Sequence, residues 1–117
     1  MQAPIVDFSF LYEISENDPQ YISDVIEIFL GTMPDGLEQL EHLIHNTEDW
    51  DALYKQAHFL KSSVSVVKVR DMFDNLGQIE ALAKSQTGKP EIEALMRTLS
   101  ETFKEAHPVL IAEMQKK

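Results

Sequence analysis

Apolar residues recur every three or four positions along most of the chain, and this spacing constrains the fold more than any other feature of the sequence. The clearest case is a run at successive intervals of four, three, four and three, formed by Leu53, Ala57, Leu60, Val64 and Val67. At about 100° per residue, these positions line one side of a helix. A helix with one apolar side buries that side against other elements. We therefore expect a core helix that begins near Trp50 and runs to about Val67.

The same spacing predicts three more long helices and one short one. The long helices are expected at about 19–46, 72–85 and 90–114, with a short turn at 68–71 and a short helix at about 7–14 that covers one end. No alternating strand pattern interrupts this arrangement. Four amphipathic helices with short loops pack most simply as an up-down-up-down bundle. We predict an all-α fold and a single domain over residues 1–117, with the bundle at about 18–116.

Several residues predict where these helices begin or bend. Asp18 and Pro19 suit the cap and first position of the second helix, and residues 47–49 supply a cap for the next one. Pro34 predicts a kink or a brief break, because proline lacks a backbone donor. Residues 107–108, a His-Pro pair, predict a bend in the last helix.

His58 is the candidate reactive side chain. It follows Ala57, so it lies about 100° from the centre of the apolar line, at the edge of the buried strip and facing water. Lys61 and Ser62 lie one turn further on, beside the imidazole, and Ser65 extends the same polar face. A neutral imidazole is a good nucleophile near pH 7, because its usual pKa is about 6.5. This setting suits a histidine that holds a phosphoryl group, bound through Nε2, the nitrogen farther from the backbone.

The charge of the chain excludes some partners. The formal net charge is -10, which argues against nucleic acid and anionic membranes. Residues 1–54 hold 12 acidic side chains and no Lys or Arg, whereas Lys55, Lys61, Lys68 and Arg70 follow within sixteen positions. This cluster predicts a local positive field around His58. The alternative is an ordinary solvated helix face.

Other classes of site and location find little support. There is no cysteine, so disulfides and thiolate metal sites are impossible. His42 and His45 lie three apart on one helix but lack matching ligands elsewhere, so we expect no metal site. The start of the chain lacks the pattern of a secretion signal, and no apolar run is long enough to span a membrane. We expect a soluble, cytoplasmic protein.

The run A-H-F-L-K-S-S at residues 57–63, followed by Leu76 and Glu80 on the next expected helix, resembles the histidine-containing phosphotransfer domain of multistep bacterial phosphorelays. Helix order and lengths are similar to that family over nearly the whole chain. One position departs from the family pattern, because Ser62 stands where glycine usually follows the lysine. Serine is still small, and its hydroxyl can contact phosphoryl oxygens.

The resemblance implies a phosphocarrier and not an enzyme in its own right. In that family, the histidine at the place of His58 accepts a phosphoryl group from the aspartate of one receiver domain and passes it to another. The lysine at the place of Lys61 helps to balance the phosphoryl charge. The implied partners are response-regulator receiver domains and a hybrid sensor histidine kinase. We expect a monomer without a cofactor, with Mg²⁺ bound only by the partner receiver.

Apolar side chains beside His58 form a candidate docking surface. Phe59 and Val66 lie about 200° and about 180° from Ala57, so both point away from the core of a simple bundle. The alternative is that the short first helix covers them. The predicted docking residues are Tyr54, Lys55, Phe59, Ser65 and Val66.

Two other functions compete with the phosphocarrier. One is a helical adaptor, or a degenerate phosphotransfer domain that binds receivers without carrying phosphate; the presence of His58 and Lys61 argues against it. The other is the dimerisation helix pair of a sensor histidine kinase. That type usually has an acidic residue directly after its histidine, whereas this chain has Phe59.

Overall fold

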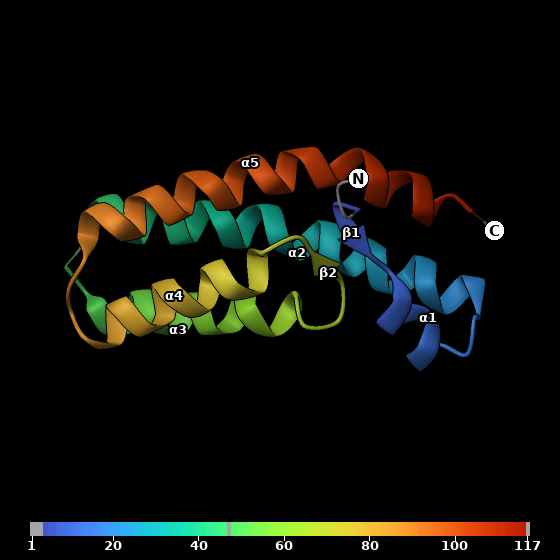
Figure 1. Ribbon diagram of the computed structural model, residues 1–117, viewed down its shortest axis with the longest axis horizontal. Coiled ribbons are helices and arrows are strands. Elements are labelled where there is room, and N and C mark those ends of the chain that lie inside the picture. The colour runs from blue at the N-terminus through green and yellow to red at the C-terminus, as the bar shows by residue number, and fades with distance from the viewer. Residues whose placement is uncertain (1–3, 47, 117) are drawn as a thin grey trace.

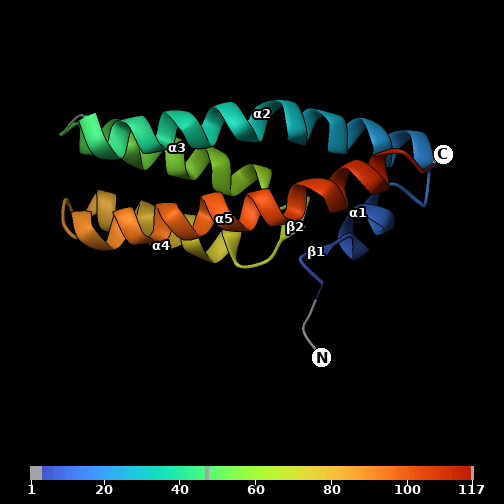
Figure 2. The ribbon, with the colours of Figure 1, turned by 90° about the horizontal axis from the view of Figure 1, so that it is seen from above.

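Four long helices form the bundle that the apolar spacing predicts. The computed structural model describes residues 4–46 and 48–116. Successive long helices run in opposite directions, which confirms the all-α, up-down-up-down prediction with its short extra helix (Figures 1 and 2). In chain order the elements are β1 (Val6–Asp7), α1 (Ser9–Ile14), α2 (Pro19–Asn46), α3 (Trp50–Ser63), β2 (Lys68–Val69), α4 (Met72–Lys84) and α5 (Lys89–Met114).

The helices pack in a closed ring. α2 contacts α3 and α5, and α4 contacts the same two helices from the other side. α2 and α5 have 28 and 26 residues, about twice the 14 and 13 residues of α3 and α4. α3 and α4 therefore lie along only one end of α2 and α5. α1 and the two strands occupy the other end (Figures 1 and 2).

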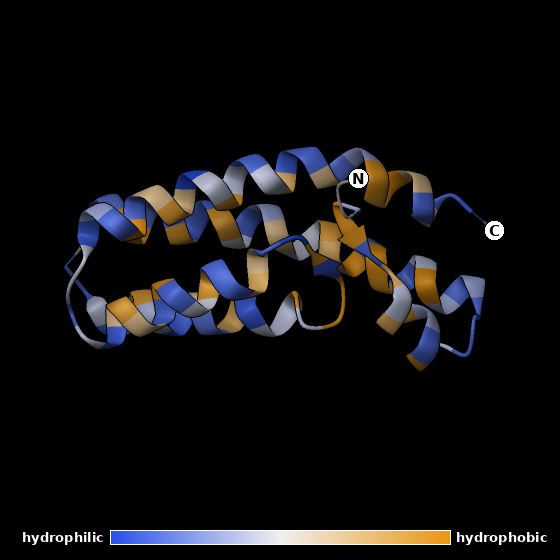
Figure 3. Ribbon diagram, viewed as in Figure 1, coloured by the Kyte–Doolittle hydropathy of each residue, from blue (hydrophilic) through white to orange (hydrophobic). Residues whose placement is uncertain are grey.

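The core is built from the apolar side of each helix. All five residues of the line that begins at Leu53 are buried, which confirms that line as a core element. Figure 3 shows hydrophobic and hydrophilic residues alternating along each helix, as expected for helices with one buried side. The two faces of α3 are thus fixed, and His58 lies beside the buried one.

A two-stranded antiparallel sheet joins the start of the chain to the turn after α3. Val6 pairs with Val69 and Asp7 with Lys68, and the Arg70 backbone N–H donates to the Ile5 carbonyl oxygen at 2.8 Å. The sequence predicted only a turn at 68–71. Two-residue strands have no detectable alternation, so the pattern could not reveal them.

α3 ends at Ser63, four residues before the predicted end near Val67. The Val64 N–H still donates to the Leu60 carbonyl, but the Ser65 N–H donates to the Ser62 carbonyl, which tightens the chain into a turn. β-branched valines have lower helix propensity, and the pairing of β2 with β1 draws the following backbone away. Val64 and Val67 stay buried, so the chain leaves the helix without leaving the core.

Neither internal proline interrupts its helix. α2 continues through Pro34 and α5 through Pro108, so of the two outcomes predicted at Pro34, a kink or a brief break, the break does not occur. Both prolines are exposed, and water can hydrate the carbonyl groups that they leave without a donor. The predicted helix starts are confirmed at Pro19 and at Asp49, whose carboxylate accepts from the Ala52 N–H at 3.0 Å. Thr47 lies outside the described residues.

α2 and α3 approach closely at Gly36. A Cβ atom added there would lie 2.4 Å from Leu60 Cδ2, and the Gly36 carbonyl accepts a hydrogen bond from the Gln56 side chain at 3.0 Å. Leu60 is fully buried in the core. The absence of a side chain at Gly36 therefore allows the contact that sets α3 against α2.

We predict that Gly36→Ala destabilises the fold, by roughly 1–3 kcal/mol of overpacking, offset in part by the better helix propensity of alanine. Gly31→Ala is the matched control, because it lies in the same helix and an added Cβ meets nothing within 4 Å. That variant should be stabilised by up to about 1 kcal/mol. Urea unfolding measures both. Equal effects of the two substitutions would contradict the close approach.

Candidate functional site

His58 lies on α3 with its imidazole in solvent. Ala57 and Leu60 lie on the buried face of α3. His58 lies at the edge of that face, with its side chain directed toward solvent. The exposed fraction of the imidazole side chain is 58%. The predicted exposure of this residue is therefore confirmed, and the ring is accessible to a partner protein.

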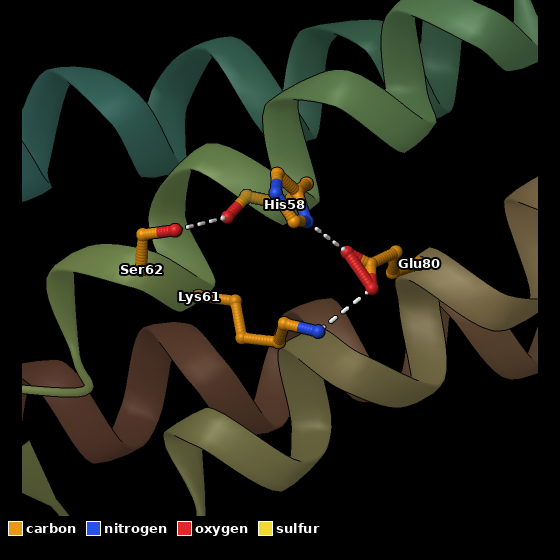
Figure 4. A network of polar contacts seen from close by, with 4 residues as sticks. All are labelled: His58, Lys61, Ser62 and Glu80. Carbon is orange, nitrogen blue, oxygen red and sulfur yellow. Dashed lines mark hydrogen bonds and ion pairs between the residues drawn. The ribbon is translucent and has the colours of Figure 1, made fainter.

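A carboxylate from the neighbouring helix holds the imidazole. Glu80 lies on α4, and its Oε2 is 2.6 Å from Nδ1 of His58. Its other oxygen, Oε1, accepts from the Lys61 ammonium at 2.8 Å. Figure 4 shows the carboxylate between the His58 imidazole and the Lys61 ammonium, which both come from α3. Only 15% of the Glu80 side chain is exposed, so this bridge lies at the groove where α3 packs against α4.

The bridge fixes the charge state of Glu80. The Lys61 ammonium, followed by the bond to His58, holds the pKa of the Glu80 carboxyl below its ordinary value of 4.5, although partial burial opposes this. The side chain is therefore a carboxylate near neutral pH. A carboxylate only accepts hydrogen bonds, so the short contact requires a proton on Nδ1. The neutral imidazole then carries its lone pair on Nε2, which has no hydrogen-bond partner among the described residues.

The two serines near His58 bond to the backbone. The Ser62 hydroxyl donates to the His58 carbonyl oxygen at 3.2 Å (Figure 4), and the Ser65 hydroxyl donates to the Ser62 carbonyl at 2.6 Å. Ser62 is exposed and one turn from the imidazole, as expected. Its hydroxyl must turn away from the backbone to meet a phosphoryl group.

Comparison with known proteins assigns the family. The family model described as the Hpt domain matches residues 24–116, which is most of the chain. The chain belongs to the Hpt family.

The relatives of this Hpt domain are much longer proteins. Virulence sensor protein BvgS from Bordetella pertussis and that from Bordetella parapertussis are each 33% identical to it over 88 residues, and the protein of the same name from Bordetella bronchiseptica is 32% identical. Each alignment covers 74% of this chain but 7% of the relative. No solved structure gives a significant match. Membership of the Hpt family gives this domain a phosphotransfer role in a multistep phosphorelay, as a phosphocarrier and not a conventional enzyme.

The predicted docking residues of the Hpt domain differ in exposure. Phe59 is 51% exposed, so the first helix does not cover it. Val66 is half-buried and packs against the core, which leaves it less available. Lys55 and Ser65 are exposed, whereas Tyr54 is half-buried and stacks beside the His58 ring. A docking role for these residues stays a prediction.

The four cations near His58 in the sequence do not converge on it. Lys55 pairs with Asp51 at 2.9 Å, and Lys61 pairs with Glu80. The Lys68 ammonium lies 5.0 Å from the centre of the Phe10 ring, and Lys68 and Arg70 line a hollow beside β2 and the start of α4. Lys61 shares Glu80 with the imidazole, and Lys55 and Lys61 are each paired with a carboxylate, so the predicted positive field is partly offset.

Two absences concern the described part of the Hpt domain. Within it, no three histidine or carboxylate side chains gather closely enough to hold a metal ion. His42 Nδ1 instead contacts the Asn46 side-chain amide at 3.2 Å, and His45 lies 3.8 Å from Glu93. Among residues 4–46 and 48–116, no helix is both long and apolar enough to cross a membrane.

Sequence reasoning missed the role of Glu80 as the group that binds His58. The residue was noted only as part of the family pattern. It lies 22 positions from His58, and helical spacing within α3 cannot reveal a contact across two helices. The available signal was its position on the helix predicted to pack next to α3.

We predict that Lys61→Met raises the pKa of Glu80 toward 4.5, because the ammonium is the main cause of its depression. Since the folded pKa lies below the unfolded one, the bridge stabilises the fold above the unfolded pKa and is lost as pH falls through the folded pKa. The stability difference between wild type and Lys61→Met should therefore shrink on acidification below 4.5.

Carboxyl-carbon NMR titration and urea unfolding at several pH values measure these two effects. Lys55→Met is the control, because its pair with Asp51 is exposed and does not touch Glu80. If Glu80 titrates over the same pH range in wild type and in Lys61→Met, the Lys61 ammonium is not the main cause of the lowered pKa.

Proposed function

We propose that this Hpt domain carries a phosphoryl group on Nε2 of His58, accepting it from the phosphoaspartate of one receiver domain and passing it to the aspartate of another. The observation that supports this most is the Glu80 carboxylate at Nδ1, which leaves the lone pair on the outward nitrogen. A nucleophile is most effective when a neighbouring group fixes its tautomer and orientation. The 58% exposure of the side chain lets a receiver reach it.

The transfer step needs little machinery from this chain. The Nε2 lone pair attacks the phosphorus of the acyl phosphate in line, the Nε2–P bond forms, and the P–O bond to the aspartate breaks. The bonding electron pair returns to the aspartate carboxylate. Nδ1 keeps its proton, so the phosphorylated ring carries positive charge, which the Glu80 carboxylate stabilises at 2.6 Å. Phosphoryl transfer depends mainly on positioning and charge stabilisation.

Lys61 supplies the counter-charge for the phosphoryl group. Its ammonium is bound by Glu80 at 2.8 Å, and 24% of the side chain is exposed, so it can turn toward a phosphoryl group without losing its place at the site. Mg²⁺ bound by the partner receiver would neutralise further charge on the transferring group. We propose no cofactor on this chain.

Receiver domains and a hybrid sensor histidine kinase are the proposed partners, and the proposed location is the cytoplasm. The similarity to virulence sensor proteins supports a place in a sensory phosphorelay. The exposed Phe59, next to His58 on α3, gives a receiver an apolar contact close to the reacting nitrogen. We propose that the domain acts as a monomer, because transfer needs only one His58 and one receiver.

We predict that incubation with a phosphorylated receiver transfers label to this chain, and that the label is acid-labile and base-stable. His58→Gln should abolish the label, because the amide of glutamine is no nucleophile. His42→Gln is the matched control: its histidine is also exposed on a helix, and its Nδ1 contacts the Asn46 side chain. If no receiver in a broad panel transfers label to the wild-type chain or to His42→Gln, the phosphate-independent adaptor is favoured instead. Label retained by His58→Gln would show that another residue accepts it.

We predict that Phe59→Ala weakens receiver docking by roughly 1–2 kcal/mol, as for an aromatic residue at the centre of an interface. The half-saturating receiver concentration should rise about tenfold while the maximal transfer rate stays close to wild type. Tyr21→Ala is the comparison, because Tyr21 is also an exposed aromatic residue but lies near the start of α2. An unchanged half-saturating concentration for Phe59→Ala would rule out this contact.

A further inference from the structure

Tyr54 lies beside the His58 ring in a geometry that sequence spacing alone does not define. It precedes His58 by four residues on α3, so the two side chains are neighbours on one face. Their ring centroids are 6.2 Å apart and the ring planes differ by 16°. This separation and near-parallel orientation fall within the range of offset aromatic stacking. The phenol ring is therefore stacked beside the imidazole, near-parallel to it and laterally offset.

The Tyr54 ring is itself held in place from two sides. It is half-buried and packs against the hydrophobic core. The Lys84 ammonium lies 6.0 Å from its ring centre, at the distance of a weak cation–π contact. Lys84 comes from α4, one turn beyond Glu80. The Lys84 ammonium, the Tyr54 phenol and the His58 imidazole thus connect α4 to α3, as the Glu80 bridge does.

The bond to Glu80 leaves one motion of the imidazole unrestrained. A single hydrogen bond at Nδ1 fixes one edge of the ring, but the ring can still tilt about that contact. A flat neighbour against the ring face opposes this tilt. In-line attack depends on the direction of the Nε2 lone pair, so the tilt decides how often the ring is aligned for reaction.

We propose that Tyr54, supported by Lys84, is a positioning residue that sets the plane of the His58 imidazole for phosphoryl transfer. The inference rests on the proposed function of His58 and assigns Tyr54 a different role from the docking role that the sequence predicted. Tyr54 is half-buried and touches the reacting ring, whereas Phe59 is exposed and has no ring contact with the imidazole.

Transfer kinetics separate positioning from docking. Tyr54→Leu keeps apolar bulk but removes the flat ring, and should lower the maximal transfer rate from a phosphorylated receiver roughly tenfold. The half-saturating receiver concentration should change less than about twofold. Tyr54→Phe should restore the rate, because it restores the ring. Phe59→Ala is the matched comparison, because it is expected to raise the half-saturating receiver concentration and to leave the maximal rate close to wild type. A raised half-saturation at an unchanged maximal rate, or no change in either, would overturn the positioning role.

A second measurement is independent of activity. Nitrogen-15 NMR of His58 reports how often Nδ1 carries the proton, and Tyr54→Leu should increase the share of the Nε2–H tautomer, because the ring leaves Glu80 more often. An unchanged tautomer share would overturn the proposal. If no receiver transfers label to the wild-type chain, the proposed function fails and this measurement still decides the role of Tyr54. Should Tyr54→Leu fail to fold, Lys84→Met tests the support of the Tyr54 ring. It should lower the maximal transfer rate about threefold. An unchanged rate would be the contrary result.

Discussion

The carboxylate of Glu80 is the contact on which the site depends. It binds an imidazole at 2.6 Å and an ammonium at 2.8 Å, and both belong to the neighbouring helix. The two contacts exist only because α4 packs along α3, since Glu80 lies 22 residues from His58 and 19 from Lys61 in the chain. The close approach of α2 at Gly36 fixes α3 from the opposite side. The bundle thus serves to hold one carboxylate and one imidazole at bonding distance.

Placing an acidic residue beside a phosphoryl acceptor has an electrostatic cost as well as a benefit. Glu80 keeps the proton on Nδ1. In the proposed transfer its charge stabilises the positive ring, but the same charge repels the incoming phosphoryl oxygens. Lys61, bound to the same carboxylate, offsets that repulsion. In the proposed transfer, the opposing charges of Glu80 and Lys61 suit a carrier, which must release the phosphoryl group to the next receiver.

The sequence predicts the features that depend on spacing within one helix. The helices, the buried line that begins at Leu53 and the exposure of His58 all follow from the period of the apolar residues. Features that depend on contact between elements were missed, including the β1–β2 pair and the binding of His58 by Glu80. Tyr54 illustrates the difference: spacing placed it beside His58, but only the packing of α3, α4 and the core shows that it is half-buried against the imidazole.

Ser62 shows how a departure from a family pattern can be accommodated. Glycine at this position leaves room for a receiver, and a serine side chain reduces that room by two heavy atoms. In this chain the hydroxyl donates to the His58 carbonyl one turn back, so the side chain lies along the helix. The hydroxyl also stays one turn from the reacting ring, where a small rotation would aim it at phosphoryl oxygens. The hydroxyl has one proton, so donation to a phosphoryl oxygen requires that it leave the His58 carbonyl.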